Sequence, residues 1–195
     1  DLSGMDLTGI NLRGANLSGT NLSSAGLNYS QMNGIISSED APVILSRAWL
    51  QNADFTGAML TGADLSNPEF TNEGHVWKTI FNGANMENAD LSYVILSTSQ
   101  FVSTWMEGVN LSNSWIFNSD MSDVYFQYSN LNSLNIQDSN LENAYFKGVN
   151  GTDALFGSCN LAHATFGNYF SWDISDRANL AGAKFSGSDL FDARF

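Results

Sequence analysis

The chain has 195 residues and a net charge of −13, from 20 acidic and 7 basic side chains. This acidity disfavours direct binding of nucleic acid, because phosphate groups require lysine and arginine. No stretch approaches the ~20 consecutive apolar residues of a membrane-spanning helix, so no membrane span is expected. The single cysteine, Cys159, can form no internal disulfide.

A large apolar residue recurs at every fifth position along most of the chain. Helices repeat near 3.6 residues and strands at two, so this spacing indicates a repeat architecture whose units bury their apolar residues against neighbouring units. The positions after the central apolar residues are rich in Ser, Gly, Asn and Thr, as expected where the chain turns a corner. In the opening run the central residues are Leu2, Leu7, Leu12, Leu17, Leu22, Leu27 and Met32.

Three segments break this register, at 33–48, 72–78 and 167–177. In the first, serine and acidic residues ahead of Pro42 indicate a short capped helical turn before Val43. The second, which includes Trp77, should form a bulge or small loop, and the third contains Trp172. Loops that project from a rigid scaffold often carry binding residues, although repeat proteins also tolerate insertions at corners without any functional consequence.

Between these breaks the repeats carry a recognisable motif. The segments Ala15-Asn16-Leu17-Ser18-Gly19, Ala63-Asp64-Leu65-Ser66-Asn67 and Ala89-Asp90-Leu91-Ser92-Tyr93 resemble the motif of the pentapeptide-repeat family. The resemblance implies an all-β fold, a right-handed quadrilateral parallel β-helix of about ten coils that forms one domain over residues 1–195. It also implies that residues twenty apart lie above one another.

The chain starts and stops in phase with the repeat, at Leu2 and Phe195, with no capping element. An open solenoid end exposes core side chains and unpaired backbone. We therefore expect a domain excised from a longer protein, or coils whose open ends contact a partner or one another.

Central residues whose numbers differ by a multiple of twenty should lie above one another, and grouping them in this way predicts the columns of the core. One column should contain Met86, Met106, Phe126, Phe146 and Phe166, and like residues should pack on like. Gly151 interrupts another column. We expect Leu155 or a tilted backbone to fill the space that it leaves.

The same sorting applied to the outward residues predicts two polar faces and two aromatic ones. On the polar faces, columns such as Asp90, Asn110 and Asn130 should form hydrogen bonds along the coil axis. One of the other faces carries the candidate binding residues Trp105, Tyr125 and Tyr145. The secondary candidates are Trp115, Phe117, Tyr128, Trp77 and Trp172.

The aromatic column has two interpretations. Contiguous exposed apolar side chains commonly mark a binding site, and rings with a polar edge suit protein or carbohydrate partners. Rings ~5 Å apart can also stack on one another and simply stiffen the face. The sequence leaves both open.

No arrangement of residues indicates catalysis. His75 and His163 are far apart, without the spacing of metal ligands, and no phosphate loop or nucleophile motif is present. A square rod also offers no obvious cleft for paired carboxylates. We expect no enzyme activity, no metal and no cofactor.

The resemblance suggests three functions. Pentapeptide-repeat proteins include bacterial proteins that protect DNA gyrase with a DNA-like acidic rod, cyanobacterial proteins of unknown role, and modules of secreted effectors. Our leading hypothesis is a non-catalytic scaffold that binds a protein partner, as a module of a larger bacterial protein in the cytoplasm or in a secreted effector. The alternatives are an acidic DNA mimic that binds a type II topoisomerase, and a carbohydrate-binding rod that uses Trp105, Tyr125 and Tyr145. The gyrase-protecting members typically end in a helical dimerisation element, which is not present after Asp192.

Overall fold

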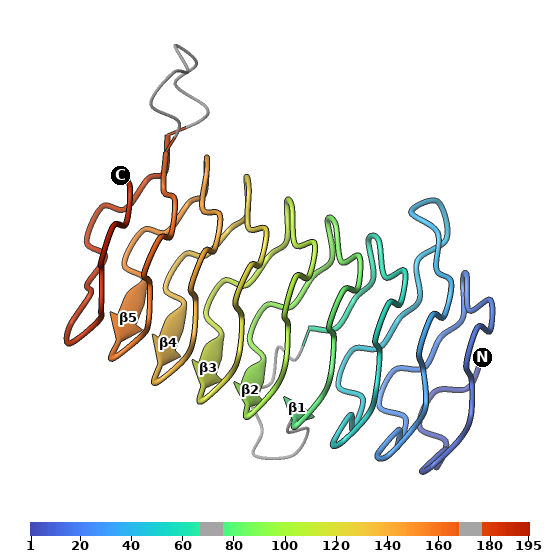
Figure 1. Ribbon diagram of the computed structural model, residues 1–195. Coiled ribbons are helices and arrows are strands. Elements are labelled where there is room, and N and C mark those ends of the chain that lie inside the picture. The colour runs from blue at the N-terminus through green and yellow to red at the C-terminus, as the bar shows by residue number, and fades with distance from the viewer. Residues whose placement is uncertain (67–75, 168–176) are drawn as a thin grey trace.

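The chain forms a stack of square coils, with the two termini at opposite ends (Figure 1). A computed structural model describes residues 1–66, 76–167 and 177–195. One side of the stack is a parallel sheet of five short strands in the order β1-β2-β3-β4-β5. Isolated parallel bridges join the coils on the other three sides. The strands are β1 (Val76–Trp77), β2 (Ile95–Ser97), β3 (Trp115–Phe117), β4 (Asn135–Gln137) and β5 (Leu155–Gly157).

The pairing register confirms the predicted right-handed quadrilateral β-helix. Trp115 of β3 pairs with Asn135 of β4, and Asn135 pairs with Leu155 of β5, so residues twenty positions apart lie against each other in this uninterrupted part of the chain. The described residues contain no helix, and therefore none that could cross a membrane.

The corners explain the composition of the repeat. From Gly83 to His163, the second residue after every central residue has a positive φ. At most corners a backbone bond closes the turn, as between the Ala84 N–H and the Phe81 carbonyl at 2.9 Å. The side chain of the residue before the central one often accepts a hydrogen bond from the backbone N–H two positions later. For example, the Ser92 N–H donates to Asp90 Oδ1 at 2.9 Å. This is why Asn and Asp are frequent at that position.

The corners after the strands use buried serine hydroxyls instead. The Ser99 N–H donates to Ser119 Oγ at 3.2 Å, and the Ser119 N–H donates to Ser139 Oγ at 3.1 Å. Cys159 is the next residue in this inward column, where its thiol donates to the Gly157 carbonyl at 3.4 Å. Cys159 is therefore a buried structural thiol that replaces a serine.

The core consists of stacked columns, as the twenty-residue sorting predicts. The Phe126 and Phe146 rings lie 5.3 Å apart, and Phe146 and Phe166 lie 4.6 Å apart. The prediction for Gly151 is wrong in its choice of residue, because Leu155 is exposed on the outer surface. Leu180 of the following coil fills the space instead: a Cβ added at Gly151 would lie 3.0 Å from Leu180 Cδ2.

The bridges also show how many residues each interruption adds. Asn21 pairs with Ile44 instead of with residue 41, so three residues are inserted, and Ser38 and Ala41 form an antiparallel bridge there. The expected helical turn is wrong, because Val43 continues directly as a buried core position. Asp54 pairs with Ile80 instead of residue 74, and Asn150 with Asn179 instead of residue 170. The interruption between Asp54 and Ile80 therefore adds six residues, and the one between Asn150 and Asn179 adds nine.

Replacing Phe146 with Ala should destabilise the protein strongly. The ring is fully buried, stacks on Phe126 and Phe166, and meets Phe156 edge to face. We expect a loss of about 3–5 kcal/mol in the free energy of unfolding, measured with urea. Phe191→Ala is the matched control, because that ring is 69% exposed and its removal should change little. Similar losses for the two variants would contradict the stacked core.

The thiol of Cys159 should be protected in the native state. Burial raises the pKa of the Cys159 thiol, so the reactive thiolate is scarce at neutral pH. We expect alkylation by iodoacetamide to be at least about tenfold slower in native buffer than in urea. Equal rates would show that this corner opens freely.

Candidate interaction face

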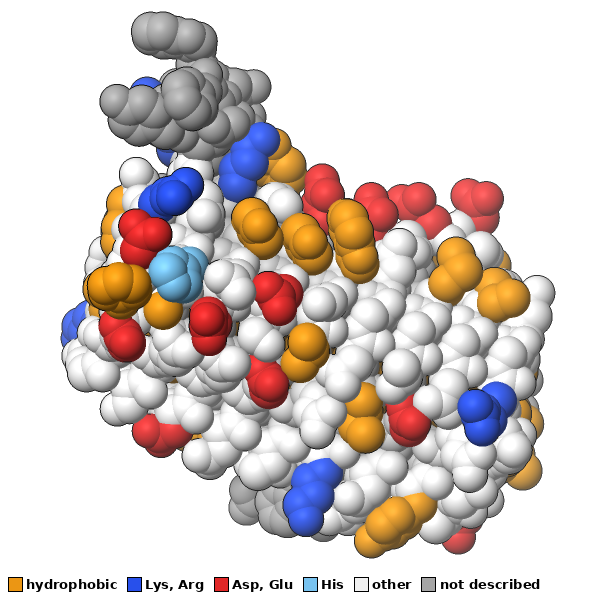
Figure 2. Space-filling model, in the orientation of Figure 1, with side chains coloured by type: hydrophobic (Ala, Val, Ile, Leu, Met, Phe, Trp, Pro, Cys, Tyr) orange, Lys and Arg blue, Asp and Glu red, His pale blue; other side chains and the backbone are white. Residues whose placement is uncertain are grey.

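One outward column of the β-helix carries a row of large apolar and aromatic side chains, several of them exposed. We call it the aromatic face, and bridges between successive coils place its residues in one line. Hydrophobic side chains form an interrupted row along this side, with acidic side chains along the edge above them (Figure 2). The residues of the aromatic face are Ile36, Met59, Asn85, Trp105, Tyr125 and Tyr145.

The three rings predicted as a binding site form a continuous stack. Trp105 and Tyr125 lie 4.6 Å apart with their planes 12° from parallel, and Tyr125 and Tyr145 lie 5.1 Å apart at 2°. Trp105 is 52% exposed and Tyr145 is 40% exposed. Ring faces inside the stack therefore cover each other, and the ring edges face solvent.

The backbone holds these rings at the spacing of the coils. The Trp105 N–H donates to the Ala84 carbonyl at 3.0 Å, and the Tyr125 N–H donates to the Thr104 carbonyl at 3.1 Å. The central residue that follows each ring is fully buried, as Met106 is after Trp105. Strand spacing near 4.8 Å is close to the optimum for stacked rings, so the coil geometry itself produces the stack.

Ile36 and Met59 extend the aromatic face and are absent from the sequence-based candidates. They are 42% and 48% exposed. The insertions hide them, because three residues are added after Ile36 and six more before Asn85. Correcting the twenty-residue spacing for the residues inserted at each interruption would assign both to this column.

A hollow interrupts the aromatic face between Met59 and Trp105. Asn85 lies between them, and its side chain is short and bent, since Asn85 Oδ1 accepts a hydrogen bond from the Glu87 N–H at 2.9 Å. The hollow has a volume of about 480 Å³. Its lining residues are Gly57, Ala58, Met59, Gly83, Asn85, Glu87 and Trp105.

The secondary candidates do not join the aromatic face. Trp115 and Phe117 lie on β3, on the opposite side of the coil, and meet edge to face at 5.9 Å. Tyr128 lies at the corner that follows Tyr125, and Lys147 Nζ lies 5.5 Å from the centre of its ring. Trp77 belongs to β1, and Trp172 lies outside the described residues.

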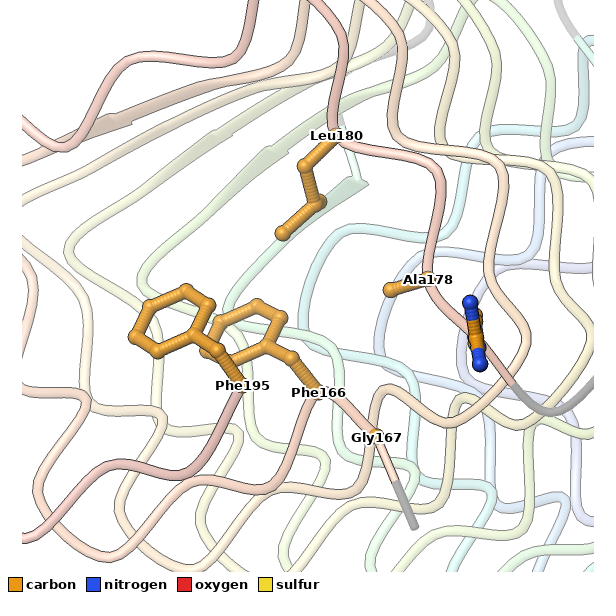
Figure 3. A pocket seen from close by; sticks show the side chains of 6 residues that line it. Phe166, Gly167, Ala178, Leu180 and Phe195 are labelled. Carbon is orange, nitrogen blue, oxygen red and sulfur yellow. The ribbon is translucent and has the colours of Figure 1, made fainter. Parts of the chain in front are cut away.

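The last coil presents core rings to solvent. Phe195 is 69% exposed and stacks on Phe166 at 4.7 Å. Figure 3 shows the two rings beside a pocket of about 270 Å³, into which Leu180 and Ala178 also point. An end-on contact with a partner would form here, and it stays a prediction.

The polar faces form the hydrogen-bonded ladders that the sequence predicts. Asn110 Nδ2 donates to Asp90 Oδ1 at 3.1 Å, and Asn130 Nδ2 donates to Asn110 Oδ1 at 3.1 Å. On the opposite side Asn140 Nδ2 donates to Asp120 Oδ1 at 3.1 Å. These carboxylates are thus part of the scaffold.

No group of potential metal ligands occurs within residues 1–66, 76–167 and 177–195. His163 Nδ1 lies 3.3 Å from Asp192 Oδ2, and both side chains are largely exposed. His75 lies outside the described residues.

A family model for pentapeptide repeats matches eight copies, over residues 1–36, 45–72, 76–113 and 106–143. The chain is a pentapeptide-repeat protein. Proteins of this family are generally non-enzymatic interaction scaffolds, and nothing among the matches indicates a catalytic family. No curated relative matches the sequence.

Solved structures of other pentapeptide-repeat proteins are similar to this one. HetL, involved in heterocyst differentiation regulation in the cyanobacterium Nostoc sp. strain PCC 7120, is 22% identical over 99% of this chain and 90% of its own, with a TM-score of 0.36. Rfr23 from the cyanobacterium Cyanothece 51142 is 17% identical over 73% of this chain and 90% of its own, with a TM-score of 0.35. A trypsin-treated variant of QnrB1, a plasmid-mediated fluoroquinolone resistance protein, is 18% identical over 98% of this chain and 85% of its own, with a TM-score of 0.36. At these values the similarity carries no argument about function.

Tyr125→Ser should destabilise this pentapeptide-repeat protein more than Tyr145→Ser. Tyr125 stacks on both Trp105 and Tyr145, whereas Tyr145 stacks only on Tyr125 among the described rings. Each stacked pair contributes about 0.5–1.5 kcal/mol beyond the buried area, so the two variants should differ by about 1 kcal/mol in urea unfolding. Equal losses would mean that the second stacking contact contributes nothing to stability.

Proposed function

We propose that this protein is a non-catalytic scaffold that binds a protein partner through the aromatic face. The observation that supports this most directly is a single line of side chains on a rigid backbone, in which Tyr125 is half-buried and the other four are exposed: Ile36, Met59, Trp105, Tyr125 and Tyr145. Aromatic residues and methionine are enriched at protein interfaces, and rings already locked in a stack lose little conformational entropy on binding.

The stacking geometry favours a protein over a carbohydrate. Sugars pack their C–H groups against open ring faces. In this stack both faces of Tyr125 are covered, by Trp105 and by Tyr145. At Tyr125 the ring edge and the hydroxyl remain, and these suit the mixed apolar and polar contacts of a protein surface.

The polar faces give little support to DNA mimicry. DNA carries one negative charge for about every 1.7 Å of its axis. Here Asp90 is followed along its column by the neutral Asn110, Asn130 and Asn150. The Asp90 carboxylate also accepts hydrogen bonds from Asn110 Nδ2 and the Ser92 N–H. Such interrupted and internally bonded carboxylates imitate a phosphate backbone poorly.

A combined substitution of Trp105, Tyr125 and Tyr145 with Ser should abolish partner binding. The protein, immobilised as bait, would capture a partner that is identified by mass spectrometry, purified and titrated against each variant. The variant should remain folded, because the buried Met106, Phe126 and Phe146 beneath the face are unchanged. We expect affinity to fall about a hundredfold or more, since central aromatic residues dominate interface energies.

The matched control replaces Trp49, Trp115 and Leu155 with Ser. These residues are also exposed, but they lie in the opposite column of the coil. Partner affinity should be unchanged. If the first variant keeps full affinity and only its thermal midpoint falls, the stack is structural and the proposal is wrong.

A further inference from the structure

The hollow at Asn85 lies where the aromatic face lacks one large side chain. Met59, Asn85 and Trp105 occupy three successive coils of one column. Two coil spacings of ~4.8 Å therefore separate Met59 from Trp105, which leaves room for one planar group between them. Asn85 does not fill this space, because its carboxamide oxygen is held by the Glu87 N–H.

The open space extends to the corner that precedes the aromatic face. Gly57 and Gly83 line the hollow, and a Cβ added at either would meet no heavy atom within 4 Å. A side chain entering from a partner would thus meet no backbone obstruction at this edge.

The lining combines an open ring face with a carboxylate. One face of the Trp105 ring is covered by Tyr125, and the other borders the hollow. Glu87 also lines the hollow and is exposed. Glu107, also exposed, lies at the equivalent corner position of the next coil, since the Asn88 N–H donates to its carbonyl at 2.9 Å. A planar cation satisfies both parts of this lining.

We propose that the hollow binds the guanidinium group of an arginine in a basic segment of the partner protein. The guanidinium stacks on the open face of Trp105, occupies the space that a large side chain at position 85 would fill, and pairs with the Glu87 carboxylate. This inference rests on the proposed function, which it deepens by naming the chemistry of the partner. The chain's net charge of −13 adds long-range attraction for a basic segment.

Arginine fits this site better than the other candidates. A lysine ammonium is a compact, strongly hydrated charge that cannot stack as a plane. A neutral aromatic ring would stack on Trp105 but would offer no positive charge to the Glu87 carboxylate at the rim. Only arginine is both planar and cationic at physiological pH.

The test uses four acetylated and amidated peptides that are identical except at one central position. That position carries arginine, lysine, citrulline or phenylalanine, within a flexible Gly/Ser sequence that contains two further lysines. Binding to the full chain is measured by NMR titration, which follows the Trp105 indole N–H and the Asn85 backbone amide. We expect the arginine peptide to bind about tenfold more tightly than the lysine and citrulline peptides and to shift both signals.

Two variants test the location. Asn85→Tyr places a ring in the gap and should reduce affinity for the arginine peptide about tenfold or more; Glu87→Gln keeps the backbone bond to Asn85 and should also weaken binding. Asn135→Tyr is the matched control, because Asn135 lies between Trp115 and Leu155 in the opposite column. This control should leave affinity unchanged.

Equal binding of the arginine, lysine and citrulline peptides would overturn the proposal, as would no detectable binding of the arginine peptide. Tighter binding of the phenylalanine peptide would assign the hollow to a neutral ring and also overturn it. The scaffold function fails on a different result, namely a partner that still binds after all three stacked rings are replaced. A partner that is lost with the rings but unaffected by Asn85→Tyr would refute only the arginine site.

Discussion

The fixed distance between coils is the constraint on which the rest of the structure depends. Backbone amides donate to carbonyls of the neighbouring coil, as the Phe101 N–H does to the Asp120 carbonyl at 2.7 Å. Each side chain is thereby held one strand spacing from its equivalent in the next coil. Phenylalanine rings inside, amides on the polar faces and aromatic rings outside all form ladders for this one reason. The Phe126–Phe146 stack and the Asn110–Asn130 hydrogen bond both join equivalent residues of neighbouring coils at the same backbone spacing.

This constraint also explains where the structure departs from regularity. A small side chain can replace a large one in a column without disturbing its neighbours, because the backbone hydrogen bonds, and not the side chains, set the distance between coils. At Gly151 the gap is inside, and Leu180 of the next coil closes it since a void in the core is costly. At Asn85 the gap is on the outer surface, where an open space costs little because it creates no void in the core. The same kind of omission thus produces a repacked core in one place and a hollow in the other.

The sequence predicted the fold and the stacked columns of side chains because both follow from the spacing of the repeat. The columns of Phe146 and Tyr125 are simple multiples of twenty and were found directly. Counting failed only where residues are inserted, so Ile36 and Met59 were separated from the column to which they belong. The helical turn ahead of Val43 was wrong because capping residues are also good turn residues, and a three-residue insertion is too short for a helix. The position of Asn85 below Trp105 follows from the count of twenty, but the open space beside it depends on how the surrounding side chains pack, which the repeat spacing does not specify.

The stacking that stiffens the aromatic face also decides what the face can recognise. Rings that cover one another offer edges and hydroxyls, which favours a partner with a mixed polar and apolar surface over one that needs open ring faces. At the Trp105 end of the stack, the ring has one face that no other described ring covers, and it lines the hollow together with Glu87. Under the proposed function, structural stacking and binding are compatible roles of Trp105, Tyr125 and Tyr145. The internal contacts of the stack provide rigidity, and under the proposed function its exposed edges form the surface that the partner contacts.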